Sequence, residues 1–163
     1  YSAAASKNDP DTLTWDQAIA DTEHQAAWLE AATLEVNALT KHGTWTLVLK
    51  SEASTPILPG TWVFRIKRTP DGAIKKLKGR YCVRGDLEET TTNNYAPVCA
   101  WSTVRTFLVL CLTINWTTCS IDFDNAFVQA PLKDPVWIHV PRGFKSPHGH
   151  DYCLQLNKSL YGL

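Results

Sequence analysis

Residues 61–84 read TWVFRIKRTPDGAIKKLKGRYCVR, and this stretch determines more of the expected fold than any other part of the chain. The aromatic and β-branched residues of Thr61–Arg68 favour a β-strand. Pro70-Asp71-Gly72 is typical of a turn, because proline fixes its φ angle and glycine tolerates a positive one. We therefore expect Thr61–Arg68 and Lys76–Val83 to form an antiparallel hairpin.

Positive charge is concentrated in this predicted hairpin. The 163-residue chain has no formal net charge, with 16 Lys and Arg against 16 Asp and Glu. Half of the basic residues lie here beside the single acid Asp71, namely Arg65, Lys67, Arg68, Lys75, Lys76, Lys78, Arg80 and Arg84. Basic residues on strands are often only solvated surface, but this density favours contact with phosphates. We expect one strongly positive face.

The segment before the hairpin is predicted to be mainly helical. Residues 14–17, Thr-Trp-Asp-Gln, resemble a capping box that opens a helix. From His24 to Lys41 apolar residues recur at helical spacing, and Gly43 is placed to end that helix. Thr44–Leu49 has the composition of a strand, and residues 1–13 form a small polar N-terminal segment.

The segment after the hairpin is predicted to mix helices and strands. The polar residues Asp86–Asn94 are the expected hinge or boundary. The elements expected after it are a helix at Thr103–Thr113, a strand at Thr117–Phe123, a short helix at Asn125–Ala130, and strands at Val136–Val140 and Cys153–Leu156. Because no alternating βαβ units are visible, the expected fold class is α+β.

Cysteine usage and hydropathy give expectations about the cellular compartment of the chain. The five cysteines are odd in number and include no Cys-x-x-Cys pair, which favours a reduced, intracellular chain. No stretch is long and apolar enough to span a bilayer, and no secretion signal is visible. The chain lacks an initiator Met and stops directly after a patterned segment, which favours a piece of a longer polypeptide.

Residues 120–127 read SIDFDNAF and place a carboxylate at the end of a predicted apolar strand. Asp122 in that position could hold Mg²⁺ with substrate phosphates, because Mg²⁺ takes few protein ligands. An aspartate at a strand end is more commonly a turn or helix cap, so composition leaves both interpretations open. The tryptophans likewise either pack in a core or stack on bases. The residues around His148-Gly149-His150 fit a polar loop better than a zinc site.

A series of short blocks from about Thr14 to Leu163 resembles the reverse transcriptase domain of copia-type LTR retrotransposon polyproteins. The blocks are Trp28 with Glu35 and Leu39, Gly43-Thr44-Trp45, Leu47-Val48, Trp62-Val63-Phe64 with Lys67, Asp71-Gly72, Lys78-x-Arg80, Val83-Arg84-Gly85, Tyr95-Ala96-Pro97-Val98, Thr103-x-Arg105, Asp122–Phe127, Val136–Phe144 and Ser159-Leu160-Tyr161-Gly162-Leu163. Each block alone is weak, whereas the ordered series is specific. The resemblance implies that residues 14–163 form the fingers and first part of the palm of a right-hand polymerase, truncated before the second palm motif.

This resemblance implies roles for the residues of the predicted palm. Asp122 takes the position of a catalytic metal ligand, and Phe123 would lend its backbone carbonyl to the same metal. Asp124 and Asn125 fall where the backbone lines the incoming triphosphate. Phe127 falls where an aromatic steric gate excludes a ribose 2′-OH.

In the fingers, the basic residues implied to contact the triphosphate are Lys67, Arg68, Lys78 and Arg80, and the hairpin register leaves the choice among them open. The implied enzyme is an RNA-directed DNA polymerase that uses Mg²⁺ or Mn²⁺. Its implied partners are an RNA or DNA template-primer, a deoxynucleoside triphosphate, and the remaining palm, RNase H and integrase of the Pol polyprotein, with no membrane. The implied location is a cytoplasmic virus-like particle or the nucleus.

The chain also departs from the family pattern. Val128-Gln129-Ala130 replaces the usual Leu-x-Gly, and Lys78-Gly79-Arg80-Tyr81-Cys82 replaces Lys-Ala-Arg-Leu-Val. The second palm motif, Tyr-x-Asp-Asp, does not occur in the sequence. Because a two-metal site needs both ions held about 4 Å apart, this piece alone is not expected to polymerise. Two alternatives remain open: a non-catalytic nucleic-acid-binding relic, and a metal hydrolase that uses Asp122 and Asp124.

Overall fold

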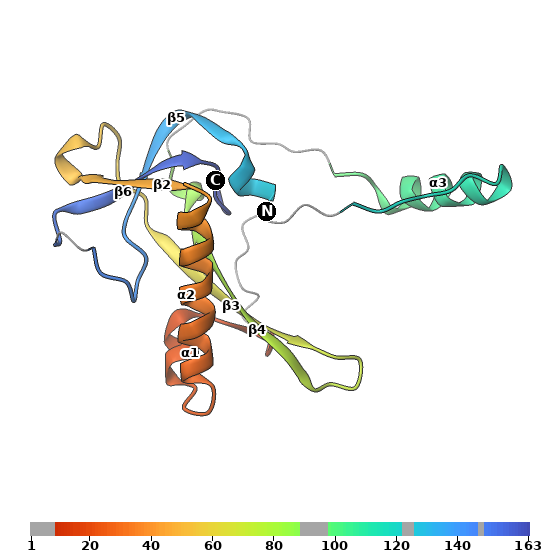
Figure 1. Ribbon diagram of the computed structural model, residues 1–163, viewed down its shortest axis with the longest axis horizontal. Coiled ribbons are helices and arrows are strands. Elements are labelled where there is room, and N and C mark those ends of the chain that lie inside the picture. Colours follow the sequence, from red (N-terminus) through yellow and green to blue (C-terminus); the bar gives the residue numbers. More distant parts are fainter. Residues whose placement is uncertain (1–8, 89–97, 122–125, 147–148) are drawn as a thin grey trace. The chain divides into compact units, whose positions relative to one another are not determined.

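The computed structural model describes residues 9–88, 98–121, 126–146 and 149–163. The chain divides into two compact units, one made of residues 1–89 and 125–163 and the other of residues 90–124. The first division falls inside the segment 86–94, where the sequence predicts a boundary. Figure 1 traces the elements of each unit.

The hairpin predicted from residues 61–84 is confirmed. Strands β3 (Gly60–Arg68) and β4 (Ile74–Val83) pair antiparallel, and β4 begins two residues earlier than predicted. Gly72 in the connecting turn has a φ of 88°, a conformation that glycine adopts without steric cost. Strand β1 (Thr12–Leu13) pairs with the other edge of β3, so the sheet order is β1-β3-β4.

Two helices pack against this sheet (Figure 1). Helix α1 (Trp15–Ala20) begins at the predicted capping box, in which Thr14 and Gln17 each accept the backbone N–H of the other. Helix α2 (Gln25–Lys41) ends just before Gly43, which has a φ of 63°. Both helix predictions are confirmed.

Aromatic rings between the helices and the sheet form the centre of the core. The fully buried Trp28 of α2 meets Phe64 of β3 edge-on, with ring centroids 5.4 Å apart. Trp62 stacks on Phe64 at 5.5 Å. Gly79 of β4 lets α2 approach closely, because a Cβ there would lie 3.4 Å from the backbone of Ala31. Core packing therefore explains Trp28 and Trp62 without any contact to a base.

A second sheet joins the residues after α2 to the C-terminal residues. Its order is β2-β6-β5, built from β2 (Trp45–Leu49), β6 (Tyr152–Lys158) and β5 (Pro131–Ile138), all antiparallel. The predicted strand Val136–Val140 is displaced, because β5 starts and ends earlier. Pro135 is tolerated inside β5 because this is an edge strand and its pairing is interrupted between Pro131 and Val136.

A short turn of 3₁₀-helix, η3 (Ala126–Gln129), stands where the sequence predicts a helix at Asn125–Ala130. Only Ala130 separates η3 from Pro131, and the residue before a proline disfavours the α conformation, so the helix cannot continue. Val128 of η3 is fully buried. None of the described helices is long and apolar enough to cross a membrane.

The described part of the second unit contains helix α3 (Trp101–Thr113), which starts two residues before the predicted Thr103. The predicted strand Thr117–Phe123 is wrong over its described residues, because residues 117–121 have no regular structure. A strand needs a neighbour for its backbone N–H and C=O groups, and the described residues of this unit provide no other strand. Residues 122–123 lie outside the described part of the chain.

Candidate nucleic-acid interface

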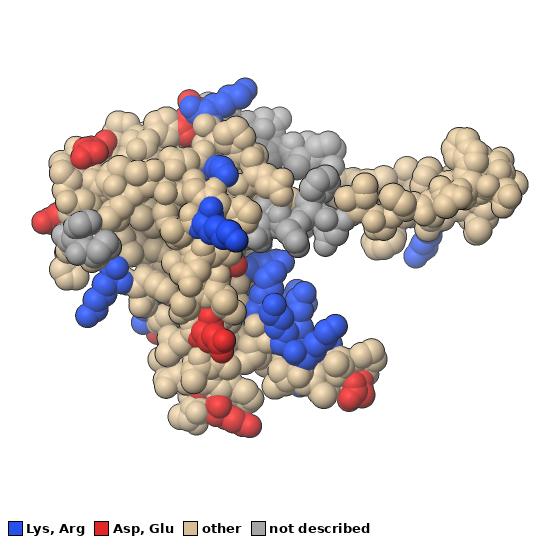
Figure 2. Space-filling model, in the orientation of Figure 1, with Lys and Arg blue, Asp and Glu red and all other residues tan. Residues whose placement is uncertain are grey.

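One face of the β3–β4 hairpin carries a row of cations. Pairing places Arg65 opposite Lys78 and Lys67 opposite Lys76, and Arg80 lies opposite Val63. Since side chains two residues apart in a strand share a face, Arg65, Lys67, Lys76, Lys78 and Arg80 lie on the same side of the sheet. We call these five residues the basic face. Figure 2 shows Lys and Arg side chains gathered over this hairpin.

Lys78 lies at the centre of the basic face. It is half-buried, whereas Arg65, Lys67, Lys76 and Arg80 are exposed. Burial lowers the pKa of Lys78, and the charges of Arg80, Lys67 and Lys76 lower it further, against the opposing effect of a glutamate described below. The direction of these effects indicates that the cations lie within electrostatic reach of one another.

The basic face has no ion-pair partner within the described part of the chain. Every described salt bridge with a separation of 4.0 Å or less involves other residues, including Arg68, Arg84 and Arg142. Like charges placed directly opposite each other destabilise a sheet unless an anion lies between them. The arrangement is therefore suited to a polyanion.

The C-terminal residues contact the same hairpin. The guanidinium of Arg80 lies over the ring of Tyr161, 5.4 Å from its centroid. The backbone N–H of Val83 donates to the carbonyl of Tyr161 at 2.7 Å, and the N–H of Gly85 donates to the carbonyl of Gly162 at 3.1 Å. Residues 161–162 thus extend along the free edge of β4 and place an aromatic ring under one of the cations.

Glu35 of α2 reaches the same edge of β4. Its side chain is half-buried, and burial raises the pKa of the carboxyl group. The backbone N–H of Tyr81 and the charges of Lys78 and Arg80 act in the opposite direction. Glu35 also lines a cavity of about 110 Å³ together with Lys76 and Lys78.

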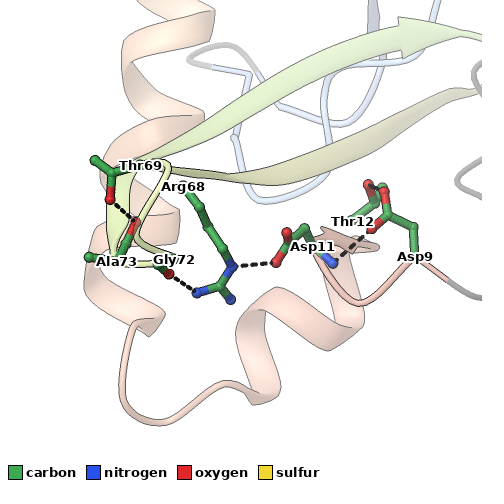
Figure 3. A network of polar contacts seen from close by, with 7 residues as sticks. All are labelled: Asp9, Asp11, Thr12, Arg68, Thr69, Gly72 and Ala73. Carbon is green, nitrogen blue, oxygen red and sulfur yellow. Dashed lines mark hydrogen bonds and ion pairs between the residues drawn. The ribbon is translucent and has the colours of Figure 1, made fainter.

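Arg68 is placed differently from the other three predicted nucleotide contacts. Figure 3 shows its guanidinium between Asp11 and Gly72. Its Nε donates to the carboxylate of Asp11 at 2.9 Å, and its Nη1 donates to the carbonyl of Gly72 at 3.0 Å. The carboxylate of Asp9 in turn accepts the backbone N–H of Asp11 and the hydroxyl of Thr12. Arg68 therefore ties the N-terminal residues to the hairpin turn, while Lys67, Lys78 and Arg80 share the basic face.

The residues predicted for the palm cannot be placed beside this face. Asp122, Phe123, Asp124 and Asn125 lie outside the described residues. Phe127 lies in η3, but its side chain is not among the described parts of the structure. The described residues contain no group of three His, Cys, Asp or Glu side chains that could hold a metal. The proposed Mg²⁺ site thus rests on the sequence.

Sequence reasoning missed several members of the interface. Arg65 and Lys76 were counted in the charge run but not as contacts, although their alternation with Lys67 and Lys78 at a period of two is visible in the sequence. Glu35 follows Ala31 by four residues, which places it on the buried side of α2. No sequence signal connects Tyr161 with Arg80, because the two residues are far apart along the chain.

Residues 42–163 match the family model described as Reverse transcriptase (RNA-dependent DNA polymerase). Because this match covers most of the chain, the protein belongs to the reverse transcriptase family. Its relatives further place it with the Pol polyproteins of copia-type retrotransposons, as the resemblance implied.

Three relatives illustrate the similarity. The chain is 32% identical over 143 residues to the retrovirus-related Pol polyprotein from transposon RE2 of Arabidopsis thaliana and 30% identical over 142 residues to that from transposon TNT 1-94 of Nicotiana tabacum. It is 31% identical over 166 residues to the transposon Ty1-ER2 Gag-Pol polyprotein of Saccharomyces cerevisiae. These alignments cover 83%, 83% and 93% of the chain, but only 10%, 10% and 9% of the relatives. The chain thus spans about a tenth of their length, and no solved structure gives a significant match.

Proposed function

We propose that this chain forms the fingers and the first part of the palm of an RNA-directed DNA polymerase. The observation that carries the proposal is the basic face, where two cross-strand pairs of like charge form no salt bridge of 4.0 Å or less with the described acids. Such a face gains free energy when phosphates lie between the cations. Membership of the reverse transcriptase family supplies the class of substrate, a nucleic acid and a nucleoside triphosphate.

In this proposal Lys67, Lys78 and Arg80 contact the triphosphate of the incoming nucleotide or the nucleic-acid backbone. Their charged side chains can contact phosphates, but they do not form a fixed set of hydrogen-bonding groups that would recognise base edges. Binding is therefore expected to be independent of the nucleotide sequence. Arg68 can contribute to phosphate binding only if its guanidinium gives up its contacts with Asp11 and Gly72 or binds the phosphate in addition to them. We therefore expect Arg68 to contribute less than the other three.

The proposed palm residues follow from the sequence. Asp122 would hold Mg²⁺ together with the backbone carbonyl of Phe123, since carboxylate and carbonyl oxygens are the ligands that Mg²⁺ prefers. A bound ion of this kind stabilises negative charge on the oxygens of phosphoryl transfer. Asp124 and Asn125 would line the triphosphate, and Phe127 would occupy the volume that a ribose 2′-OH needs.

The proposed partners are those of the whole Pol polyprotein: a template-primer, the rest of the palm, RNase H and integrase, acting in an intracellular particle. A second function, nucleic-acid binding without catalysis, is favoured by one observation. The basic face is built from described residues of this chain alone and does not involve Asp122 or its neighbours. Both functions share the interface and differ in whether a longer polypeptide polymerises.

The interface is tested by the salt dependence of binding. We expect the chain to bind a labelled DNA duplex weakly, with the logarithm of the affinity falling linearly as the logarithm of salt concentration rises. Lys67→Met should reduce the slope by about 0.9, which is one phosphate contact. Lys50→Met, which removes the same charge outside the hairpin, should leave the slope unchanged. An affinity that does not depend on salt contradicts the proposal.

The palm is tested in a polypeptide extended through the rest of the Pol polyprotein. Asp122→Asn should lower primer extension by orders of magnitude while duplex binding persists, because the change removes charge but little volume. Phe127→Val should instead preserve deoxynucleotide incorporation and admit ribonucleotides. Full extension activity in the Asn variant, or unchanged sugar discrimination in the Val variant, refutes the corresponding role.

A further inference from the structure

The C-terminal residues hold Tyr161 at a defined place beside β4. Leu160, the residue before it, is fully buried in the core. The carbonyl of Tyr161 accepts the backbone N–H of Val83 at 2.7 Å. The carbonyl of the next residue, Gly162, accepts the N–H of Gly85 at 3.1 Å. Core packing and two backbone hydrogen bonds thus restrict the segment that carries the Tyr161 ring.

Two glycines allow this close approach of the two segments. A Cβ on Gly85 would collide with the carbonyl oxygen of Gly162, and a Cβ on Gly162 would collide with that of Val83. Gly162 also has a φ of 96°, which other residues rarely adopt. The contact between residues 161–162 and the end of β4 is therefore specified by the sequence on both sides.

The ring of Tyr161 lies beside a cation of the basic face. The guanidinium carbon of Arg80 lies over this ring, 5.4 Å from its centroid, which is within the range of a cation–π interaction. Tyr161 is half-buried and packs against the core, whereas Arg80 is exposed. The ring is thus supported from below, and the cation above it remains open to solvent.

This contact differs from those of other arginines. Three described arginines are held by carboxylates, namely Arg68 by Asp11, Arg84 by Asp86 and Arg142 by Asp16. A carboxylate occupies N–H donors of the guanidinium and balances its charge. Arg80 forms no salt bridge of 4.0 Å or less with the described acids. An aromatic ring restrains a guanidinium without cancelling its charge, so Arg80 is held in place and stays available to an anion.

A restrained arginine has an advantage in binding phosphate. An exposed arginine loses rotamer freedom when its N–H donors engage phosphate oxygens, and this loss opposes binding. Contact with the Tyr161 ring removes part of that freedom before the anion arrives. Lys78 lies on the same face of β4, two residues from Arg80, and supplies a second charge. The free energy of binding should therefore depend on the ring as well as on the cations.

We propose that Tyr161 is a positioning residue, which holds the guanidinium of Arg80 on the basic face where it binds a phosphate group. This inference rests on the proposed function of the basic face. Tyr161 itself does not contact the anion; it acts through Arg80. The resemblance to the family includes Tyr161 in its last block but implies no role for it.

Two uncharged variants isolate the ring. Tyr161→Phe keeps the aromatic ring, whereas Tyr161→Leu removes it and leaves an apolar side chain at this half-buried position. The probe is inorganic tripolyphosphate at low salt, and the readout is its dissociation constant. We expect the Phe variant to bind like the unchanged chain and the Leu variant to bind about two- to five-fold more weakly, the effect of a cation–π contact at an exposed site. Equal binding by the two variants overturns the inference.

A double-mutant cycle separates positioning from a general loss of structure. In an Arg80→Met background the Phe and Leu variants should bind equally, because the ring then has no cation to position. In a Lys67→Met background their difference should persist, because Arg80 is still present. A difference that persists without Arg80 overturns the inference. Thermal unfolding checks that each variant is folded, and Tyr161→Met replaces Tyr161→Leu if the latter does not fold.

A deoxynucleoside triphosphate separates positioning from direct contact. Tyr161→Leu should weaken the binding of deoxyadenosine triphosphate and of tripolyphosphate by the same factor, because Arg80 meets only phosphate. A loss confined to the nucleotide would mean that the ring contacts the base or the sugar, and overturns the inference.

Tyr152→Leu supplies the control, because it removes a half-buried tyrosine from β6 of the other sheet. It should bind tripolyphosphate like the unchanged chain. If the unchanged chain does not bind tripolyphosphate, the function proposed for the hairpin fails, and this inference fails with it. If it binds and the Phe and Leu variants are equal, only the positioning role fails.

Discussion

The two faces of the β3–β4 hairpin are made by the same two strands and serve opposite requirements. One face buries Trp62, Phe64 and Tyr81 against the helices. The other exposes most of its cations and sets Arg65 opposite Lys78 and Lys67 opposite Lys76. The first arrangement lowers the free energy of folding, whereas the second raises it. Alternation along a strand lets one hairpin supply stability on one face and an anion interface on the other.

The largest expected effect comes from the apolar face. Phe64 is fully buried and contacts the rings of Trp15, Trp28 and Trp62 at centroid distances of 6.0, 5.4 and 5.5 Å. Phe64→Ala should therefore lower the free energy of unfolding by about 3–5 kcal/mol. Urea unfolding measures this loss. Val63→Ala, on the opposite face, is the control. An equal loss of unfolding free energy in that variant would contradict the proposed difference between the two faces.

The next effect concerns the outer edge of β4, which the C-terminal residues contact. Gly162 has a φ of 96°, and a Cβ there would collide with the carbonyl oxygen of Val83. Gly162→Ala should cost more than about 2 kcal/mol of unfolding free energy, because steric overlap adds to backbone strain. Gly149→Ala isolates the strain, since Gly149 has a φ of 102° but nothing within 4 Å of the new Cβ. Similar losses in both variants, measured by urea unfolding, would show that the contact with β4 contributes nothing.

A smaller effect should separate stability from binding on the basic face. Lys76→Glu converts the pair with Lys67 into one of opposite charge, which should add about 0.2–1 kcal/mol to the free energy of unfolding. The same change should weaken DNA binding, because the anion then meets a carboxylate. Thermal unfolding and the duplex titration measure the two effects. Lys50→Glu is the control, and a parallel rise or fall of stability and binding would contradict the division of roles.

The smallest expected effect is a pH dependence caused by Glu35. Burial raises the pKa of its carboxyl group above the ordinary value of 4.5. Its contribution to stability is therefore complete below pH 4.5 and is lost as the pH rises through the pKa of the folded state. Glu35→Gln should thus gain stability relative to the unchanged chain between pH 4 and pH 7. Denaturant midpoints at both pH values test this, and an unchanged difference would mean that the carboxyl group is not held in a buried site.

Much of the fold could be predicted from local pattern. The capping box at Thr14, the helix ending before Gly43 and the hairpin around Gly72 are all confirmed, because each depends on residues close in sequence. The strand predicted at Thr117–Phe123 failed over its described residues, since strand formation depends on a partner that composition does not reveal. The roles predicted for Asp122 and its neighbours remain predictions.

The sequence by itself determined that a hairpin rich in Lys and Arg would form and that its residues would alternate between two faces, because strand geometry has a period of two. Only the tertiary structure decided which cations are available. It placed Arg68 against Asp11, the ring of Tyr161 under Arg80, and Glu35 in the lining of the cavity beside Lys76 and Lys78. These contacts join residues far apart in the chain, and such pairings are set by packing of the whole unit rather than by local propensity.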